Sequence, residues 1–221
     1  MKLFTKVMTV AVLGLALMGC SNKHKPVTEE VVLAEANKTV VLNNDQFDDG
    51  VVKEDIVVEA TAKNKETEEE VKLVEVKIPA ETEFTDEKGE ALDTPPVIEI
   101  EAQETEEKIV KNDKVTATKN VVETNIEIKT KDGGAAIPSE PITTKVKLPE
   151  DAKVGDKVKV ELPDGVEVDK NAKLLSPRLI TITLKKTGYL TITIQPNVFK
   201  KSTVVKIVIE KEKYTPVTGG E

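Results

Sequence analysis

The feature of this sequence that most constrains its fold is an alternation of apolar and polar residues with a period of two. Because successive side chains of a strand point to opposite faces of a sheet, this alternation predicts strands that bury one face. Turn-rich stretches separate the runs and no helical pattern intervenes, so we expect a mostly β chain with one or two Ig-like or β-sandwich modules. The apolar positions of the runs are Ile56/Val58/Ala60, Val74/Val76/Ile78, Ile98/Ile100/Ala102, Ile126/Ile128, Ile142/Thr144/Val146/Leu148 and Val158/Val160/Leu162.

One stretch divides the alternating region. Residues 131–141 read KDGGAAIPSEP, and their glycines and prolines predict a linker. We therefore expect a first β-sandwich module over residues 39–130, a second over residues 142–213, and a flexible tail over residues 214–221.

The clearest local signal lies in residues 179–195, which read LITITLKKTGYLTITIQ. Two predicted strands, 179–184 and 189–195, flank the sequence Lys185-Lys186-Thr187-Gly188. Gly188 can supply the positive φ that a short connection between such strands needs.

The first 19 residues have the pattern of an export signal. Lys2 and Lys6 precede the stretch Val7 to Gly19, which is apolar apart from Thr9. Thirteen residues are too few to cross a bilayer, for which about 20 are needed. We therefore predict that residues 1–19 form a secretory signal peptide.

Cys20, the only cysteine, follows this segment directly. The sequence Leu17-Met18-Gly19-Cys20 resembles the lipobox of bacterial lipoproteins. The resemblance implies that the chain is cut before Cys20 and that its sulfur is lipidated, with palmitate as a typical acyl group. It also implies a lipid anchor in the bacterial cell envelope. Ser21 after the cysteine resembles the residue that favours the outer over the inner membrane in Gram-negative bacteria.

Residues 20–38 are predicted to be a lipidated tether. Its first part, SNKHKP, is polar. Residues 27–37 fit either a short helix, with Thr28 as its N-cap, or a strand, and both alternatives stay open. One acyl chain gives only marginal membrane binding, whereas two give a stable anchor.

A second resemblance concerns architecture. Residues 77–100, KIPAETEFTDEKGEALDTPPVIEI, resemble the IPAGT-type strand-turn-strand of bacterial surface β-sandwich modules. Glu81 stands where those modules usually have glycine. Residues 146–165 resemble the second module that often accompanies the first. The resemblance implies a β-sandwich and does not indicate a ligand.

Side chains suited to catalysis are scarce. His24, the only histidine, lies in the predicted tether, and no cysteine other than Cys20 exists. A histidine-based triad, a thiol nucleophile and a His/Cys zinc site are therefore excluded from the predicted folded part, and no glycine-rich phosphate loop occurs. We predict no enzyme and no cofactor. An enzyme that uses paired carboxylates is the weakest alternative, because 40 acidic residues form many pairs by chance.

The acidic residues bear on possible ligands. A net charge of −8 makes nucleic acid a poor partner. Asp45, Asp48 and Asp49 are weak candidates for a calcium loop, but Phe47 occupies a ligand position and Ile56 stands where the bidentate Glu should be. An Asp/Gly turn with Phe47 packed inward is the preferred interpretation.

Asn37 fits an extended bacterial N-glycosylation acceptor, because Glu35 precedes it and Thr39 follows it. Whether the site is used stays open.

The sequence predicts a non-enzymatic, membrane-anchored envelope lipoprotein that acts as a structural or interaction module. Its expected partners are the lipid bilayer, through acylated Cys20, and an envelope protein or a glycan. The alternative is a carbohydrate- or cation-binding surface module. Glycan binding would require Phe199, Tyr189 and Tyr214 to be exposed and clustered.

Overall fold

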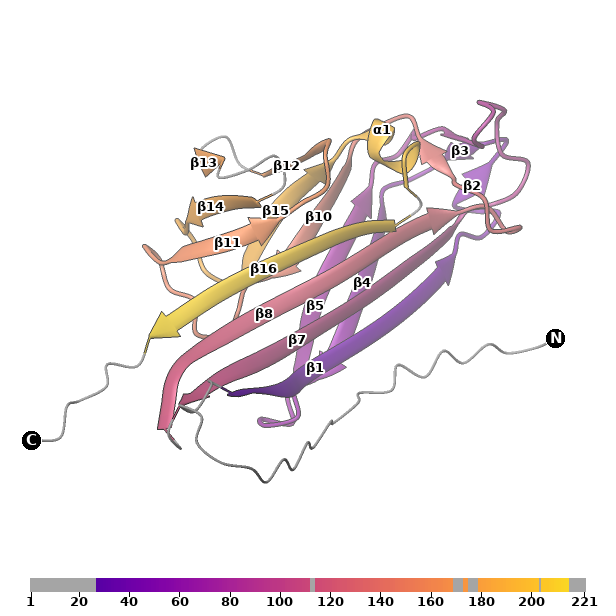
Figure 1. The fold of residues 1–221 in the computed structure, drawn as a ribbon. Coiled ribbons are helices and arrows are strands. Elements are labelled where there is room, and N and C mark those ends of the chain that lie inside the picture. Colours follow the sequence, from indigo (N-terminus) through magenta and orange to yellow (C-terminus); the bar gives the residue numbers. More distant parts are fainter. Residues whose placement is uncertain (1–26, 112–113, 169–172, 175–178, 203, 215–221) are drawn as a thin grey trace, which may run out of the picture.

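The computed structural model describes residues 27–111, 114–168, 173–174, 179–202 and 204–214. These residues form sixteen strands and one short helix, α1 (Pro196–Phe199), which confirms the predicted mostly β class. In the described part of the chain, no helix has the length and apolar character needed to cross a membrane. The strands form two main antiparallel sheets that lie face to face (Figure 1).

The larger sheet contains the longest strands of the molecule. Its order is β1-β7-β8-β16-β11-β14-β13, and every neighbouring pair is antiparallel. The strands are β1 (Val27–Val41), β7 (Val97–Lys111), β8 (Lys114–Lys129), β16 (Val204–Tyr214), β11 (Lys157–Glu161), β14 (Leu179–Thr183) and β13 (Lys173–Leu174).

The smaller sheet packs behind the larger one, and two short two-stranded pairs accompany the sandwich. The strand order of the smaller sheet is β12-β15-β10-β5-β4. The strands are β12 (Val166–Val168), β15 (Tyr189–Ile194), β10 (Ile142–Lys147), β5 (Glu70–Ile78) and β4 (Ile56–Lys63). The short pairs are β2 (Phe47–Asp48) with β3 (Val51–Val52), and β6 (Phe84–Thr85) with β9 (Ile137–Pro138).

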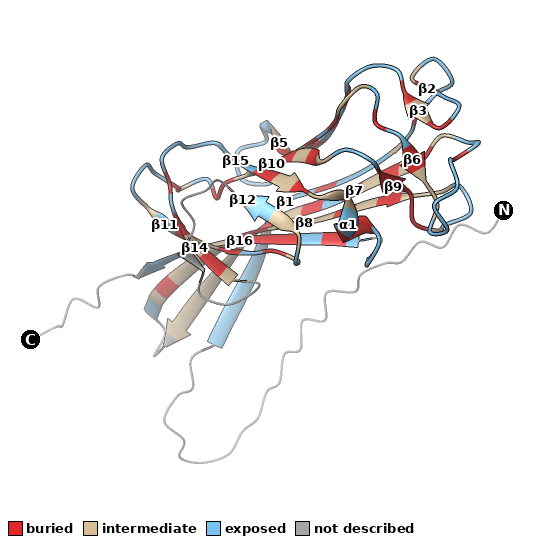
Figure 2. Cartoon of the chain, turned by 90° about the horizontal axis from the view of Figure 1, so that it is seen from above, coloured by how far each residue is buried: buried red, intermediate tan, exposed pale blue. Residues whose placement is uncertain are grey.

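A single hydrophobic core fills the space between the two sheets. Ile98 and Ile126 of the larger sheet and Val76 and Ile192 of the smaller sheet are all fully buried in it. The predicted alternation is visible as buried residues that alternate with more exposed ones along the strands (Figure 2). In β4 the burial follows a strict period of two, as expected for a strand with one face on the core.

Both sheets draw strands from both sides of residues 131–141. Strand β8 pairs with β16 in the larger sheet, and β5 pairs with β10 in the smaller one. The predicted boundary therefore does not separate two sandwiches, and the alternative of one sandwich describes the fold. The segment itself is packed, since Ala136 is fully buried. Alternation shows that a strand has one buried face, but it carries no information about which strand lies beside it.

The two strands of residues 179–195 lie in different sheets. Strand β14 pairs with β11 and β13, whereas β15 pairs with β10 and β12. The loop between them is a connection from one sheet to the other. Gly188 has the predicted positive φ of 91°, and its carbonyl accepts a hydrogen bond of 2.8 Å from the Leu148 N–H.

The N-terminal end of the described chain is a strand. Pairing of β1 with β7 begins at Val27 opposite Val110, so residues 27–37 are not helical and the predicted tether does not extend to residue 38. Strand β7 supplies hydrogen bonds to these residues, and this pairing favours the strand over the short helix. At the other end, β16 continues to Tyr214, one residue past the predicted end of the second module.

Glu81 has a positive φ of 64°. It lies just after β5 ends at Ile78, at the position where the modules that residues 77–100 resemble usually carry glycine. Glycine adopts this region of φ without the steric penalty of a Cβ, which gives a physical reason for glycine at such a turn.

Gly165 makes a packing contact that a larger residue would break. Its φ is +88°, and an added Cβ would lie 2.9 Å from Val198 Cγ2 of α1. Gly188 has nearly the same φ, +91°, but open space around it. We expect Gly188→Ala to cost about 1–2 kcal/mol of unfolding free energy through φ alone, and Gly165→Ala to cost more. Urea unfolding of both variants checks this, and equal losses would contradict the packing role of Gly165.

Candidate interaction surface

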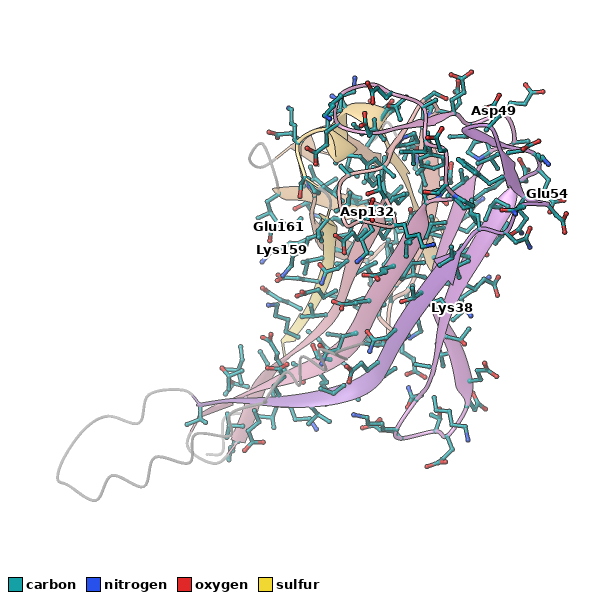
Figure 3. All side chains as sticks on the ribbon, turned by 90° about the vertical axis from the view of Figure 1, so that its right-hand side faces the viewer. Lys38, Asp49, Glu54, Asp132, Lys159 and Glu161 are labelled. Atoms are coloured by element: carbon teal, nitrogen blue, oxygen red, sulfur yellow. The ribbon has the colours of Figure 1, made fainter. Side chains whose placement is uncertain are left out.

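One end of the larger sheet extends beyond the sandwich. We call this part the ribbon end and define it as residues 27–32 of β1, 105–111 of β7, 114–121 of β8 and 210–214 of β16. Figures 1 and 3 show these four strands continuing past the smaller sheet, and Lys38, labelled in Figure 3, lies towards the opposite end of β1. The ribbon end is therefore the part of the larger sheet that extends beyond the smaller sheet.

The core-facing residues of β7 explain why the sandwich stops there. Ile98, Ile100 and Ala102 face the core, but the next positions with the same orientation are Glu104 and Glu106. Burial alternates along β7 as far as Glu104, whereas residues 106–110 are all of intermediate exposure. Charged side chains cannot supply an apolar face, so the smaller sheet has nothing to cover beyond this point.

A buried ion pair joins the two sheets where the ribbon end begins. Lys147 Nζ of β10 lies 2.6 Å from Glu104 Oε2 of β7, and the two side chains are 13% and 1% exposed. Glu104 Oε1 has no hydrogen-bond partner among the described residues, and the same holds for the buried hydroxyls of Thr124 and Thr144. A charge that is buried this deeply is tolerated only because its partner is present.

A second polar cluster ties the loop after β10 to the same region. Lys211 Nζ of β16 lies 2.9 Å from both Asp151 Oδ2 and Asp156 Oδ2, and Asn120 Nδ2 of β8 donates to Asp151 Oδ1 at 3.0 Å. Burial raises the pKa of Asp151, but its hydrogen bonds with Lys211 and Asn120 outweigh this and hold the pKa below its usual value. Burial lowers the pKa of Lys211, but the two carboxylates outweigh it and raise that pKa.

The outermost part of the ribbon end combines apolar and charged residues. Val27, Val31 and Val115 are 60%, 41% and 41% exposed. Val110 pairs with Val27 on one side and with Val115 on the other, so three strands place valines in one row. Ion pairs cross the strands nearby: Lys119 Nζ lies 2.9 Å from Glu210 Oε1.

The outer face of the smaller sheet carries a separate charged cluster. Lys72 Nζ lies 2.8 Å from Glu59 Oε1, and both Lys72 and Lys145 bind Glu75. The hydrogen bonds from Lys145 and then Lys72 hold the pKa of Glu75 below its usual value. Tyr189 joins this cluster, because its hydroxyl donates to the Lys72 carbonyl at 3.0 Å and Lys72 Nζ lies 5.7 Å from its ring centroid.

The three rings considered for glycan binding do not form a common platform. Phe199 lies on α1 and is fully buried, and Tyr189 is 37% exposed on β15. Tyr214 ends β16, and its side chain lies outside the described part of the structure. Figure 1 places α1 and the end of β16 at opposite ends of the molecule.

The aspartates considered for calcium form a tight turn instead. Phe47 is buried, as predicted, and its ring centroid lies 6.4 Å from that of Phe84. Asp49 and Gly50 have positive φ between β2 and β3, and Asp48 Oδ2 lies 3.3 Å from Lys53 Nζ. Within the described ranges, which include Asp45, Asp48 and Asp49, no group of three His, Cys, Asp or Glu side chains is arranged to hold a metal ion.

Two predicted residues lie outside the described residues, and a third lies on the surface. Cys20 and His24 fall in the undescribed N-terminal residues. Asn37 is exposed on β1, opposite Glu101 of β7. The ribbon end and the Glu104–Lys147 pair were not predicted, although Glu104 continues the inward positions of Ile98, Ile100 and Ala102 and so carried a detectable signal.

Comparisons of the chain with models of protein families, with curated proteins and with solved structures gave no match. The ribbon end is therefore interpreted from its own residues. Val27, Val31 and Val115 expose apolar side chains on the ribbon end, as expected of a contact surface.

Removal of Lys147 should strongly destabilise the fold. Lys147→Met leaves the Glu104 carboxylate buried without a cation, which costs about 3–5 kcal/mol. The double variant Glu104→Leu/Lys147→Met removes both charges and should recover most of that loss. Urea unfolding of the single and double variants measures both effects, and a single variant as stable as the wild type would show that the pair is not important.

The Glu75 cluster predicts a pH dependence of stability. Because the folded pKa of Glu75 is lowered, its stabilising effect is complete above the unfolded pKa and is lost as pH falls through the folded value. The stability difference between the wild type and Glu75→Gln should therefore shrink below about pH 4. Thermal unfolding across pH measures it, with Glu101→Gln as a control for loss of a surface charge. A difference that stays constant down to pH 2 would contradict the prediction.

Proposed function

We propose that this protein is a membrane-anchored lipoprotein of the bacterial envelope whose β-sandwich acts as a structural or interaction module. The observation that carries the proposal is the position of the lipobox-like sequence Leu17-Met18-Gly19-Cys20 directly before the sheet. In the mature chain, Cys20 would hold the acyl groups. The protein would reach its partner with the surfaces of the sandwich and the ribbon end.

The chain length between the anchor and the fold supports this arrangement. Six residues, 21–26, separate Cys20 from the first residue of β1. At about 3.6 Å per residue, Cys20 lies no more than about 25 Å from Val27. An anchor at Cys20 therefore holds the ribbon end close to the membrane and directs the opposite end of the sandwich, with α1 and the β2–β3 pair, away from it (Figure 1).

A non-enzymatic role agrees with the residues that the chain contains. Its single histidine and single cysteine both precede the first described strand. The charged clusters on the sandwich are ion pairs of lysine with carboxylate, and such pairs hold strands together or face water. An envelope protein is the favoured further partner, because Phe199 is buried and so does not join Tyr189 in a platform on which a glycan would stack.

Substitution of Cys20 tests the proposal. Cys20→Ser removes the atom that would carry the acyl group, and we expect the protein to move from the membrane fraction to the soluble fraction of the expressing bacterium. Incorporation of labelled palmitate into the wild type and not the variant provides a second measurement. Retention of the variant in the membrane fraction would contradict the lipid anchor.

A further inference from the structure

The outermost part of the ribbon end lies at the same end of the molecule as the start of β1. We call it the ribbon tip: Val27, the last two residues of β7 (Val110 and Lys111) and the first two of β8 (Lys114 and Val115). Val27 pairs with Val110, and Lys111 pairs with Lys114 at the end of the β7–β8 hairpin. The β7–β8 hairpin and the distant strand β1 therefore bring their apolar residues to one place.

The ribbon tip has a charge opposite to that of the whole chain. Its two charged residues are Lys111 and Lys114, whereas the chain has a net charge of −8. Within the hairpin, Lys108 is paired with Glu106 at 2.9 Å, and Lys114 is exposed. Exposed valines beside lysines make a surface suited to the boundary between lipid head groups and water.

We propose that the ribbon tip rests on the bilayer that holds Cys20 and binds its anionic head groups as a second membrane contact. This inference depends on the proposed lipid anchor. The anchor places the tip within about 25 Å of the membrane along the chain, and the lysines complement anionic lipid, which attracts each basic residue near its surface. The two contacts would fix the orientation of the sandwich on the membrane.

Two other partners fit the ribbon tip less well. A second copy that paired in parallel and in register along β1 would set Glu29 and Glu30 against their own copies, and like charges opposite each other destabilise a strand pair. The acidic sandwich surface of another copy would be attracted to the lysines, but the valine row would still face water. The bilayer surface accepts both the lysines and the valines.

Two exposed valines allow a matched test with the full-length acylated protein. Val115 lies in the ribbon tip and is 41% exposed, while Val204 begins the neighbouring strand β16 at its opposite end and is 40% exposed. Val204 pairs with Glu127, so it lies about 40 Å from Val115 along the strand direction. Because acylated Cys20 leaves no other cysteine, Val115→Cys and Val204→Cys can each be labelled uniquely with an environment-sensitive fluorophore.

The labelled proteins are reconstituted into vesicles that contain a lipid with a nitroxide quencher near its head group. We expect several-fold stronger quenching at position 115 than at position 204. The quenching should rise when phosphatidylglycerol is added to phosphatidylcholine. Lys114→Glu in the Val115→Cys background should remove that rise, because it reverses a charge at the tip.

Flotation of the same vesicles separates the possible failures. Protein that does not float with the vesicles contradicts the lipid anchor itself. Protein that floats but shows equal, weak quenching at positions 115 and 204 contradicts the ribbon-tip contact and leaves the anchor standing. Energy transfer between labelled copies at position 115, without quenching by lipid, assigns the tip to a second copy and also overturns the inference.

Discussion

The fold depends on one constraint: the apolar faces of two sheets must cover each other. The chain has one cysteine and so no internal disulfide, and it has no tryptophan. In the described part of the chain, aliphatic side chains outnumber the buried rings of Phe47, Phe84 and Phe199. Valine, isoleucine and alanine side chains on the inner faces form one continuous core. Each isoleucine or valine that is fully buried contributes about 1.5–3 kcal/mol relative to exposure, and such residues recur along both sheets.

The same constraint determines where the sandwich ends. The inner face of β7 changes from Ile98, Ile100 and Ala102 to Glu104 and Glu106, and the smaller sheet no longer covers it. Glu104 marks this boundary, because it is the last inward-facing residue of β7 that is buried and the first that is charged. Its partner in the ion pair is Lys147 of β10. The ribbon end is thus a direct consequence of the sequence of β7, and it gives the protein a surface that the sandwich does not provide.

The sequence predicted the strands and their buried faces well, because a period of two reports burial directly. Ile56, Val58 and Ala60 are buried as expected, and Phe47 packs inward. Partners were not predictable from this pattern. The strands on either side of Gly188 follow each other in sequence but lie in different sheets, and the alternation within each strand gives no information about its neighbour.

The two-module interpretation failed for the same reason. Residues 131–141 have the composition of a linker, yet Ala136 is fully buried and β9 in this segment pairs with β6. Residues 27–37 were ambiguous locally, and β7 decided in favour of a strand. The ribbon end needed long-range information as well, because the β7–β8 hairpin continues there together with β1 and β16, which come from distant parts of the chain.

The central claim is that both halves of the chain share one core. Amide hydrogen exchange of the native protein at increasing urea concentration tests it most directly. A single shared core predicts that amides of β5 and β8 lose protection at the same urea concentration as those of β10 and β16, their partners across residues 131–141. Loss of protection in residues 142–213 while residues 39–130 stay protected would contradict a single shared core.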